Sequence, residues 1–546
     1  MSIFTDDSDY WLHHLCCLSA SQSDEELCMN SDTEHSANRS SWIQRTSLFL
    51  GPLAAIGILK FVDLAPENPN VTKTAAIAVW MAIWWIGEAI PLAATALLPL
   101  VLFPLLGVLP GKQIAGQYIN STIFLFLGGF LVALAMQRWD LHKRLALWIL
   151  LRSGVHPWRL LLGFMGATWF LSMWISNTAT TMMMVPIGLA IVLELEETIS
   201  SKQAKSLGIG IFLGIAYGAS IGGLATLVGT PPNLSFSRIF ANLFPAAPEI
   251  TFAQWFIFAF PLSVVFFFIT WFYLACRFCR SSDEELIDEG IFRRQYDELG
   301  PISFAECAVL VHFVLMILLW LFRGDLVLGS WVVPGWSRLF PDPKAIDDGT
   351  VAITVSLLLF VIPSFAGKTG PSRILDWDTA VKVPWGLVLL FGGGFALAFG
   401  FAESGLSLWL GGQLEGLRGM PILVVIGAVC LLLTFLTELT SNTATAEMLL
   451  PVLAALSIAL EVNPLLLMVP GTLACSCAFM LPVATPPNAI VFATEQLSIG
   501  TMARTGFVIN LIGAVLITIW LYFASGLLGI EFEVFPEWAK AQSVAG

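Results

Sequence analysis

Two short polar sequences interrupt long apolar stretches of this chain, and they are nearly the same sequence. The first is Ser176-Asn177-Thr178 and the second is Ser441-Asn442-Thr443, each followed by Ala-Thr. The triplets lie 265 residues apart (176 to 441), and two further landmarks recur at that spacing. These landmarks are Gly128-Gly129-Phe130 with Gly393-Gly394-Phe395, and Pro186 with Pro451. Three matches in one register indicate an internal repeat.

Each triplet is followed further along the chain by the same second motif, Thr-Pro-Pro-Asn, at 230–233 and at 485–488. Proline has no backbone N–H, so a helix that reaches Pro-Pro leaves carbonyl oxygens of its preceding turn without donors. Proline also disfavours the helical conformation in the residue before it. The carbonyls predicted to be freed belong to Leu227, Val228, Pro482 and Val483. Free carbonyl oxygens suit a small hard cation such as Na⁺.

The asparagines of the triplets could serve a cation and an anion together. An amide offers an oxygen to a cation and an NH₂ group to an anion. Ser172 and Thr437 lie four residues before the triplet serines, so each hydroxyl is expected beside its triplet. Helices that start at these loops point positive dipole ends inward, which suits carboxylate groups. None of the four loops contains Lys or Arg, so neutral donors would hold an anion and bound cations would balance its charge.

A purely structural role is the alternative, because Ser and Thr in membrane helices often bond only a backbone carbonyl. Either triplet alone favours that interpretation, whereas two triplets in one register, each with a Pro-Pro break, favour a binding site. Glu88, Glu438 and Glu447 fall within or beside apolar stretches and are further functional candidates, although Glu438 could simply cap or pair with a neighbour.

Composition indicates the kind of protein that must position these loops. The 546 residues are 57% hydrophobic and 12% charged, with a net charge of −13. This predicts a polytopic helical membrane protein and argues against a nucleic-acid partner. An intramembrane enzyme is not expected, because no His lies in either triplet-containing stretch. The isolated Cys276-x-x-Cys279 lacks the second pair that a metal site would need.

The two stretches that contain the triplets are too long for one straight span, since about 20 residues cross the hydrocarbon. Residues 157–197 and 420–460 therefore predict two re-entrant hairpins whose arms meet at the triplets. Residues 206–245 and 465–499 predict helices broken at Thr-Pro-Pro-Asn, and 140–152 predict an amphipathic interfacial helix. Simple spans are predicted near 46–64, 73–91, 92–109, 122–140, 253–276, 304–322, 349–366, 384–402 and 505–528.

These spans give each repeat an odd number of crossings, so the second repeat would enter the membrane from the opposite side. Lys and Arg then concentrate in the loops on one face, which places the N-terminus in the cytosol and the C-terminus outside. Residues 1–43 are polar and acidic and predict a disordered cytosolic tail. Residues 279–303 predict a cytosolic linker, and 531–546 a C-terminal tail.

The chain resembles the divalent anion–sodium symporters, which carry dicarboxylates, citrate or sulfate, over about residues 46–530. The matching motifs are both triplets, Glu88-Ala-Ile-Pro91 and the segment 475–491. The resemblance implies an all-α homodimer in the cell membrane, with about eleven spans per protomer and an elevator mechanism. It implies a scaffold of residues 44–152 and 304–418, and a transport domain of residues 153–278 and 419–530.

The resemblance also implies roles for particular residues. One sodium site would use Ser172, Ser176, Asn177 and Gly229, and the other Thr437, Thr440, Asn442 and Ala484. Thr440 stands where a smaller residue is common, which changes nothing if only its carbonyl binds. The substrate would meet Ser176, Asn177, Thr178, Thr230, Pro231, Ser441, Asn442, Thr443, Thr485 and Pro486.

The resulting expectation is import of C4-dicarboxylates such as succinate, malate and fumarate, or of related di- and tricarboxylates, with at least two co-transported Na⁺. Intact triplets in both halves resemble di- and tricarboxylate carriers rather than sulfate carriers. A sodium-independent dicarboxylate exchanger of the same fold, a sulfate or citrate carrier and an anion channel stay open as alternatives. Transport in sodium-free buffer separates the exchanger, and stoichiometric coupling to a gradient excludes the channel.

Overall fold

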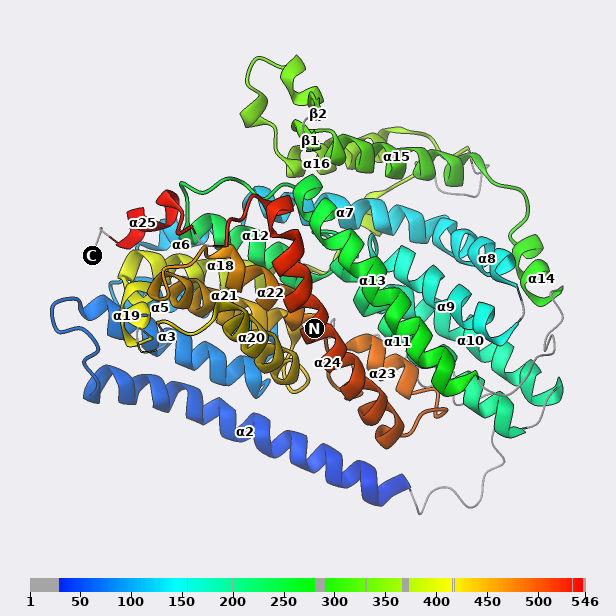
Figure 1. Ribbon diagram of the computed structural model, residues 1–546, viewed down its shortest axis with the longest axis horizontal. Coiled ribbons are helices and arrows are strands. Elements are labelled where there is room, and N and C mark those ends of the chain that lie inside the picture. The colour runs from blue at the N-terminus through cyan, green and yellow to red at the C-terminus, as the bar shows by residue number, and fades with distance from the viewer. Residues whose placement is uncertain are drawn as a thin grey trace.

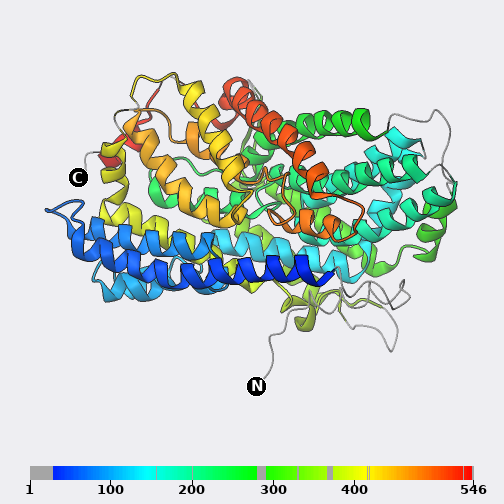
Figure 2. The same ribbon diagram turned by 90° about the horizontal axis from the view of Figure 1, so that it is seen from below.

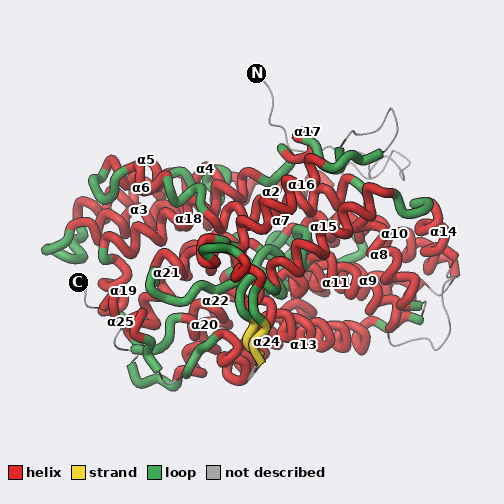
Figure 3. Tube along the Cα trace, turned by 90° about the horizontal axis from the view of Figure 1, so that it is seen from above, coloured by secondary structure: helices red, strands yellow, loops and turns green. Residues whose placement is uncertain are grey.

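A computed structural model describes residues 29–543, apart from 155, 199–200, 280–289, 329–330, 366–372, 415, 417 and 533. Helices make up most of the trace, as Figure 3 shows. The expected all-α fold class is confirmed. One short hairpin accompanies the helices, in which β1 (Leu326–Leu328) and β2 (Trp331–Val333) pair antiparallel with Leu326 opposite Val333. Their valines and tryptophan favour extended structure, and the hairpin lies in a loop that the sequence prediction left without elements.

The first half of the chain alternates long helices with short ones. Its helices are α2 (Met29–Phe61), α3 (Pro69–Ile86), α4 (Leu92–Thr95), α5 (Leu98–Leu105), α6 (Gly111–Ala115), α7 (Ser121–Arg138), α8 (Leu141–Ser153), α9 (Pro157–Ser172), α10 (Asn177–Thr198), α11 (Ser201–Leu224), α12 (Pro231–Leu243) and α13 (Phe252–Phe278). Helix α8 matches the predicted amphipathic helix, and α14 (Gly290–Glu298) lies in the predicted linker.

From α18 to α24 the second half repeats the order of α7 to α13. After α15 (Phe304–Leu321), the 3₁₀ turns η1 (Trp336–Leu339) and η2 (Pro343–Ala345), α16 (Asp348–Val361) and α17 (Trp377–Ala380) come α18 (Trp385–Ser404), α19 (Leu406–Gln413), α20 (Ile422–Leu436), α21 (Asn442–Ala459), α22 (Leu465–Cys475), α23 (Pro486–Phe492), α24 (Ile499–Ala524), η4 (Ser525–Leu528) and α25 (Glu537–Ser543). Helix α19 corresponds to α8, and the sequence prediction missed it.

Many of these helices have the length and apolarity of membrane spans. In the described part of the chain nine helices meet both conditions, and shorter apolar helices lie at Leu92–Leu105, Asp348–Val361, Ile422–Leu436 and Leu465–Cys475. Helix α2 begins at Met29, inside the tail predicted over residues 1–43. The helix that contains the apolar residues Trp42–Phe61 therefore extends into the polar sequence before them. Figure 2 shows α2 lying along the edge of the molecule beside α3.

The recurring glycines of the repeat bring helix backbones close together. A Cβ atom at Gly128 would lie 2.6 Å from the carbonyl carbon of Ala352, and one at Gly393 would lie 2.5 Å from the carbonyl oxygen of Ala96. Neither neighbour can give way, since both contacts are to backbone. Glycine is therefore needed where α7 packs on α16 and where α18 packs on the end of α4.

The two halves interlock through the short helices that follow the Pro-Pro breaks. Helix α12, from the first half, packs against α18, α21 and α22 of the second. Helix α23, from the second half, packs against α10 and α11 of the first. Figure 1 shows the exchange, with α12 among the yellow and orange helices and α23 beside the cyan-green ones. Each half therefore completes the surroundings of the other half's hairpin.

Candidate functional site

The first triplet lies where α9 ends and α10 begins. The Ser176 hydroxyl accepts a hydrogen bond from the Ala179 N–H at 3.3 Å, which caps α10. One terminal atom of the Asn177 amide lies 2.6 Å from Ser172 Oγ, 3.2 Å from the Ala219 carbonyl oxygen and 3.3 Å from the Gly229 carbonyl oxygen. With NH₂ in this position Asn177 donates to these oxygens, and with its own oxygen there it completes a group of four that suits a cation.

The second triplet repeats this geometry between α20 and α21. Thr437 Oγ1 lies 2.6 Å from Asn442 Oδ1, the same separation as between Ser172 and Asn177. Thr437 Oγ1 also lies 2.9 Å from the Cys475 carbonyl oxygen. A hydroxyl has one hydrogen, so it cannot donate fully to both acceptors. The cluster therefore holds more oxygen atoms than the single hydroxyl hydrogen can bridge. A small hard cation fits such a set of oxygen atoms.

The Thr440 hydroxyl is committed elsewhere in the second tip. It donates to the Leu436 carbonyl at 3.0 Å and contacts Thr445 Oγ1 at 2.5 Å. The Ser441 carbonyl accepts from the backbone N–H and from the hydroxyl of Thr445, each at 2.9 Å. These contacts of the hydroxyl favour the carbonyl of Thr440 as the atom that would bind a cation.

The asparagine of each Thr-Pro-Pro-Asn motif shapes the loop before it. Asn233 Nδ2 donates to the carbonyls of Gly223, Leu224 and Thr226 at 3.2, 3.4 and 2.8 Å. Asn488 Nδ2 donates to the carbonyls of Ala478 and Leu481 at 3.1 and 3.0 Å. These amides supply hydrogen-bond donors to part of the non-helical backbone. In the loop before α12, the carbonyl of Gly229 faces Asn177 instead.

Loops from the two halves of the chain lie against each other. Thr230 Oγ1 lies 3.5 Å from Ser476 Oγ, and the Tyr217 hydroxyl donates to the Phe479 carbonyl at 2.9 Å. Among the predicted residues Thr230, Thr443, Ala484 and Thr485 are buried, Ser176, Asn177, Thr178, Pro231, Ser441 and Asn442 are half-buried, and Pro486 is exposed. The Thr485 hydroxyl is buried without a partner in the described part of the chain, and Pro231 and Pro486 begin α12 and α23.

The three acidic candidates have different surroundings. Glu88 is exposed in the turn after α3, in the left-handed conformation with φ of 45°. Glu438 accepts from the backbone N–H groups of Phe479, Met480 and Leu481 at 2.7 to 3.0 Å, and from Asn510 Nδ2 at 2.7 Å. The capping interpretation of Glu438 is the one that these contacts match. Glu447 is buried against Ser235 of α12.

Several contributing residues were not predicted from the sequence. The Ala219 and Cys475 carbonyls enter through their backbones, and no side-chain pattern marks them. Asn233 and Asn488 were already visible as the last residue of the repeated Thr-Pro-Pro-Asn motif, and Glu438 as a carboxyl beside the second triplet. Backbone ligands can be identified only once the fold is known, whereas the motif asparagines could be identified from the sequence.

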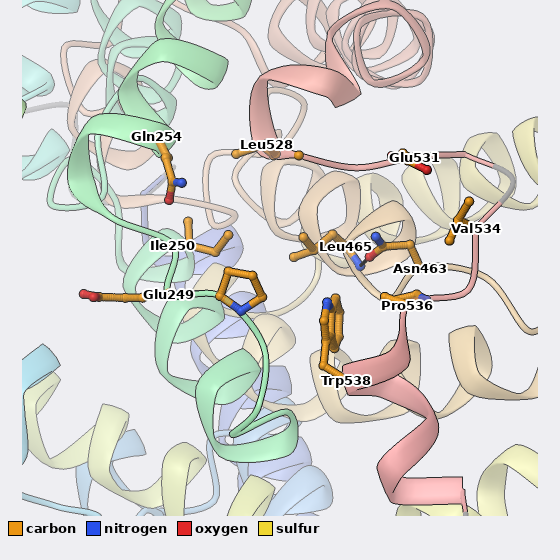
Figure 4. A pocket seen from close by; sticks show the side chains of 12 residues that line it. Glu249, Ile250, Gln254, Asn463, Leu465, Leu528, Glu531, Val534, Pro536 and Trp538 are labelled. Atoms are coloured by element: carbon orange, nitrogen blue, oxygen red, sulfur yellow. Dashed lines mark hydrogen bonds between the residues drawn. The ribbon is translucent and has the colours of Figure 1, made fainter. Parts of the chain in front are cut away.

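A separate pocket lies at the far ends of α13, α22 and α24. Its volume is about 230 Å³, and its lining includes Glu249, Asn463, Leu528, Glu531 and Trp538. Figure 4 shows that these side chains come from the segment before α13, the start of α22 and the C-terminal segment. None of the predicted sodium or substrate residues lines this pocket.

Comparison with known proteins agrees with the motifs. Residues 47–528 match the family model of the sodium:sulfate symporter transmembrane region. The sodium-dependent dicarboxylate transporter SdcS of Staphylococcus saprophyticus is 45% identical over 499 residues, covering 89% of this chain and 93% of the relative. SdcS of a Staphylococcus aureus strain is 46% identical over 502 residues, covering 90% of this chain and 93% of the relative.

Two solved transporters share the fold at low sequence identity. Alcanivorax borkumensis YdaH has a TM-score of 0.52 and 13% identity, covering 76% of this chain and 88% of its own. Neisseria gonorrhoeae MtrF has a TM-score of 0.50 and 14% identity, covering 78% and 84%. The chain is therefore a multi-pass membrane transporter and no enzyme, and it belongs to the sodium:sulfate symporter family, the divalent anion–sodium symporters.

Proposed function

We propose that this protein is a secondary active transporter that uses the sodium gradient to import C4-dicarboxylates such as succinate, malate and fumarate. The observation that carries the proposal is the pair of oxygen clusters at the triplets, each built by an amide 2.6 Å from a hydroxyl. The curated relatives are sodium-dependent dicarboxylate transporters at 45–46% identity, which supports the same substrate class.

At least two Na⁺ ions are transported with each substrate in this proposal. The first binds Ser172, Ser176, Asn177 and the Gly229 carbonyl, and the second binds Thr437, Asn442 and the carbonyls of Thr440 and Ala484. Neither cluster contains a carboxylate ligand, so each bound cation brings a net positive charge to the loops. That charge compensates a dianion in a site that has no Lys or Arg of its own.

The dicarboxylate lies between the two triplets, with one carboxylate at each. Ser176, Asn177 and Thr178 hold one end, and Ser441, Asn442 and Thr443 hold the other. Thr230, Pro231, Thr485 and Pro486 line the space between them, at the starts of α12 and α23. The prolines themselves offer no N–H group, but the positive ends of the two helix dipoles favour an anionic group there.

The carrier works as an elevator in this proposal, with the second repeat inverted relative to the first. Residues 153–278 and 419–530 form the transport domain, which slides against a scaffold of residues 44–152 and 304–418. The N-terminus is cytosolic and the C-terminus is outside. Two protomers associate through their scaffolds, and light scattering of the detergent-solubilised protein tests the homodimer.

Uptake of labelled succinate into proteoliposomes tests the function. An inward sodium gradient is expected to drive accumulation, and an equal potassium gradient is not. Accumulation that is unchanged in sodium-free buffer would replace the symporter with the sodium-independent exchanger. Competition by unlabelled sulfate and citrate against succinate ranks the remaining substrate alternatives.

A further inference from the structure

Glu447 is a carboxylic acid enclosed within the molecule, and the proposed function gives it no role. It lies on α21, and its side chain is fully buried. Its Oε1 atom contacts Ser235 Oγ of α12 at 2.5 Å, while Oε2 has no hydrogen-bond partner in the described part of the chain. Buried polar atoms are rarely left unpaired, and ionisable groups at membrane depth commonly serve transport.

The absence of a side chain at Gly394 leaves a notch in α18, and the Glu447 carboxyl fills this notch. A Cβ atom at Gly394 of α18 would lie 1.6 Å from Glu447 Oε2 and 2.1 Å from the carboxyl carbon. At the corresponding Gly129 of the first half, the nearest atom to such a Cβ is a Val228 methyl at 3.6 Å. Met182 occupies the repeat position of Glu447 and is 50% exposed. The carboxyl and its notch therefore occur only in the second half.

The notch lies between the two bodies of the proposed elevator. Glu447 and Ser235 belong to the transport domain, and Gly394 belongs to the scaffold. Ala444, three residues before Glu447 on α21, is buried in a hydrophobic cluster made mainly by α3 to α6 and α18. Sliding of the transport domain therefore withdraws the Glu447 carboxyl from Gly394.

Among the residues that the structure describes, no positive charge pairs with Glu447. The elements packed against α21 are α3, α12, α18, α19, α22 and α25. Their titratable and charged side chains are Lys73, Arg238, Glu403, Cys475, Glu537 and Lys540. Arg238 is one turn beyond Ser235, but its guanidinium donates to Gln117 at 3.3 Å, and in the described part of the chain no ion pair involves Glu447.

The protonation state follows from these surroundings. An ionised carboxylate enclosed without a cation and with one hydrogen bond is strongly unfavourable. The neutral acid encloses no charge and still hydrogen-bonds with the Ser235 hydroxyl. Entry into the notch at Gly394 therefore selects the protonated acid.

We propose that Glu447 is a proton-binding site of the transport domain, and that it must carry a proton to seat against Gly394. The inference rests on the proposed transport function. When the domain slides, the carboxyl leaves the notch, meets water and releases its proton to it. The return movement takes a proton from water again, so the cycle slows as protons become scarce.

The test is sodium-driven succinate uptake by wild type and by Glu447→Gln, measured side by side from acidic to alkaline pH. Wild-type uptake is expected to fall at alkaline pH, by roughly tenfold for each pH unit once Glu447 ionises. Glu447→Gln is neutral at every pH and should keep its rate over that range. Titration of the substrate affects both proteins equally, so the difference between their profiles reports Glu447.

A steric pair tests the notch without relying on Glu447→Gln. Gly394→Ala places a methyl group where the carboxyl lies and should abolish uptake, and Gly394→Ala with Glu447→Ala should restore it. Gly129→Ala is the matched control, because its new methyl makes only ordinary contacts. Identical pH profiles for wild type and Glu447→Gln, or no rescue by the double variant, would overturn the inference. Absence of sodium-driven uptake by wild type would instead refute the proposed function.

Discussion

At the scale of single residues, we propose that the asparagines of the triplets couple the two ligands. Each amide lies 2.6 Å from a hydroxyl of the same cluster and stands at the start of a helix that faces the proposed substrate. Two ligands that share one group change each other's affinity by equal factors. Cation and anion binding should therefore fail together when the amide is removed.

The first prediction is that Asn442→Ala weakens sodium binding and dicarboxylate binding in the same variant. Loss of one charge-assisted contact suggests about 1.5–3 kcal/mol for the anion, or roughly ten- to hundredfold. Asn177→Ala should show the same double defect, since its surroundings repeat those of Asn442. Calorimetry or thermal shift with sodium, with and without succinate, measures both affinities.

The matched control is Thr443→Ala, whose hydroxyl faces only the substrate in the proposed site. It should lose succinate affinity and keep the sodium affinity measured without succinate. If Asn442→Ala spares sodium affinity, or if both asparagine variants affect the anion alone, the shared-ligand mechanism fails.

Some residues of the site could be predicted from the sequence, and others could not. Ser172, Asn177, Thr437 and Asn442 were predicted from a repeated motif, and the structure brings each hydroxyl to its amide. The Cys475 carbonyl was not predicted, because any residue type supplies a carbonyl. Its position depends on where α22 ends, which only the folded chain determines.

At the scale of elements, an ion pair fixes the amphipathic helix α8 to the rest of the molecule. Arg144 Nε lies 2.6 Å from Glu306 Oε1, and both side chains are 8% exposed. The same guanidinium donates to the carbonyls of Gly300 and Leu299 at 3.0 and 3.2 Å. One side chain thus joins α8 to the start of α15 and to the segment before it.

The second prediction is that Arg144→Ala destabilises the protein strongly, by about 3–5 kcal/mol, because it leaves Glu306 buried without its partner. Thermal unfolding in detergent measures the loss. Arg152→Ala on the same helix is the control, since Arg152 is exposed and stacks on Trp148 at 4.0 Å. Equal melting temperatures for the two variants would contradict a structural role for the Arg144 ion pair.

Element boundaries were predictable wherever hydropathy changes sharply, as at α13 and α15. Helix α19 was missed because its eight residues continue the apolar composition of α18, and only Gly405, in the left-handed conformation with φ of 79°, separates them. The C-terminal segment was expected to be a simple tail, yet Trp538 packs edge-on against Phe240 of α12 and Phe244, the residue after α12. Such contacts between distant segments leave no local pattern.

At the scale of the whole molecule, the polar N-terminal residues lie outside the proposed transport machinery. The third prediction is that a chain starting near Ser41 retains sodium-driven uptake, because the apolar part of α2 over Trp42–Phe61 is kept. Uptake is compared at equal amounts of protein in the membrane. Loss of uptake at normal membrane levels would assign the N-terminal segment a role in transport.

The interlocked halves decide which parts can move together. Because α12 packs with α21 and α22, and α23 with α10 and α11, the hairpins and broken helices of the two halves contact one another directly. Sequence order alone separates these elements by hundreds of residues, so the exchange became visible only in the structure. Contacts of this kind would let them move together in the proposed elevator mechanism.

The fourth prediction tests that movement. Asn242 of α12 donates to Gln117 Oε1 at 3.1 Å, and this contact joins the proposed transport domain to the proposed scaffold. Cysteines at positions 117 and 242, joined by oxidation, should stop succinate uptake, because the domain can no longer slide. Reduction should restore it.

Thr518→Cys with the native Cys430 is the matched control, since that pair lies within the proposed transport domain and its crosslink should leave uptake intact. Normal uptake by a fully crosslinked 117–242 protein would rule out sliding at this interface, because the substrate would then cross without relative motion of α12 and the scaffold.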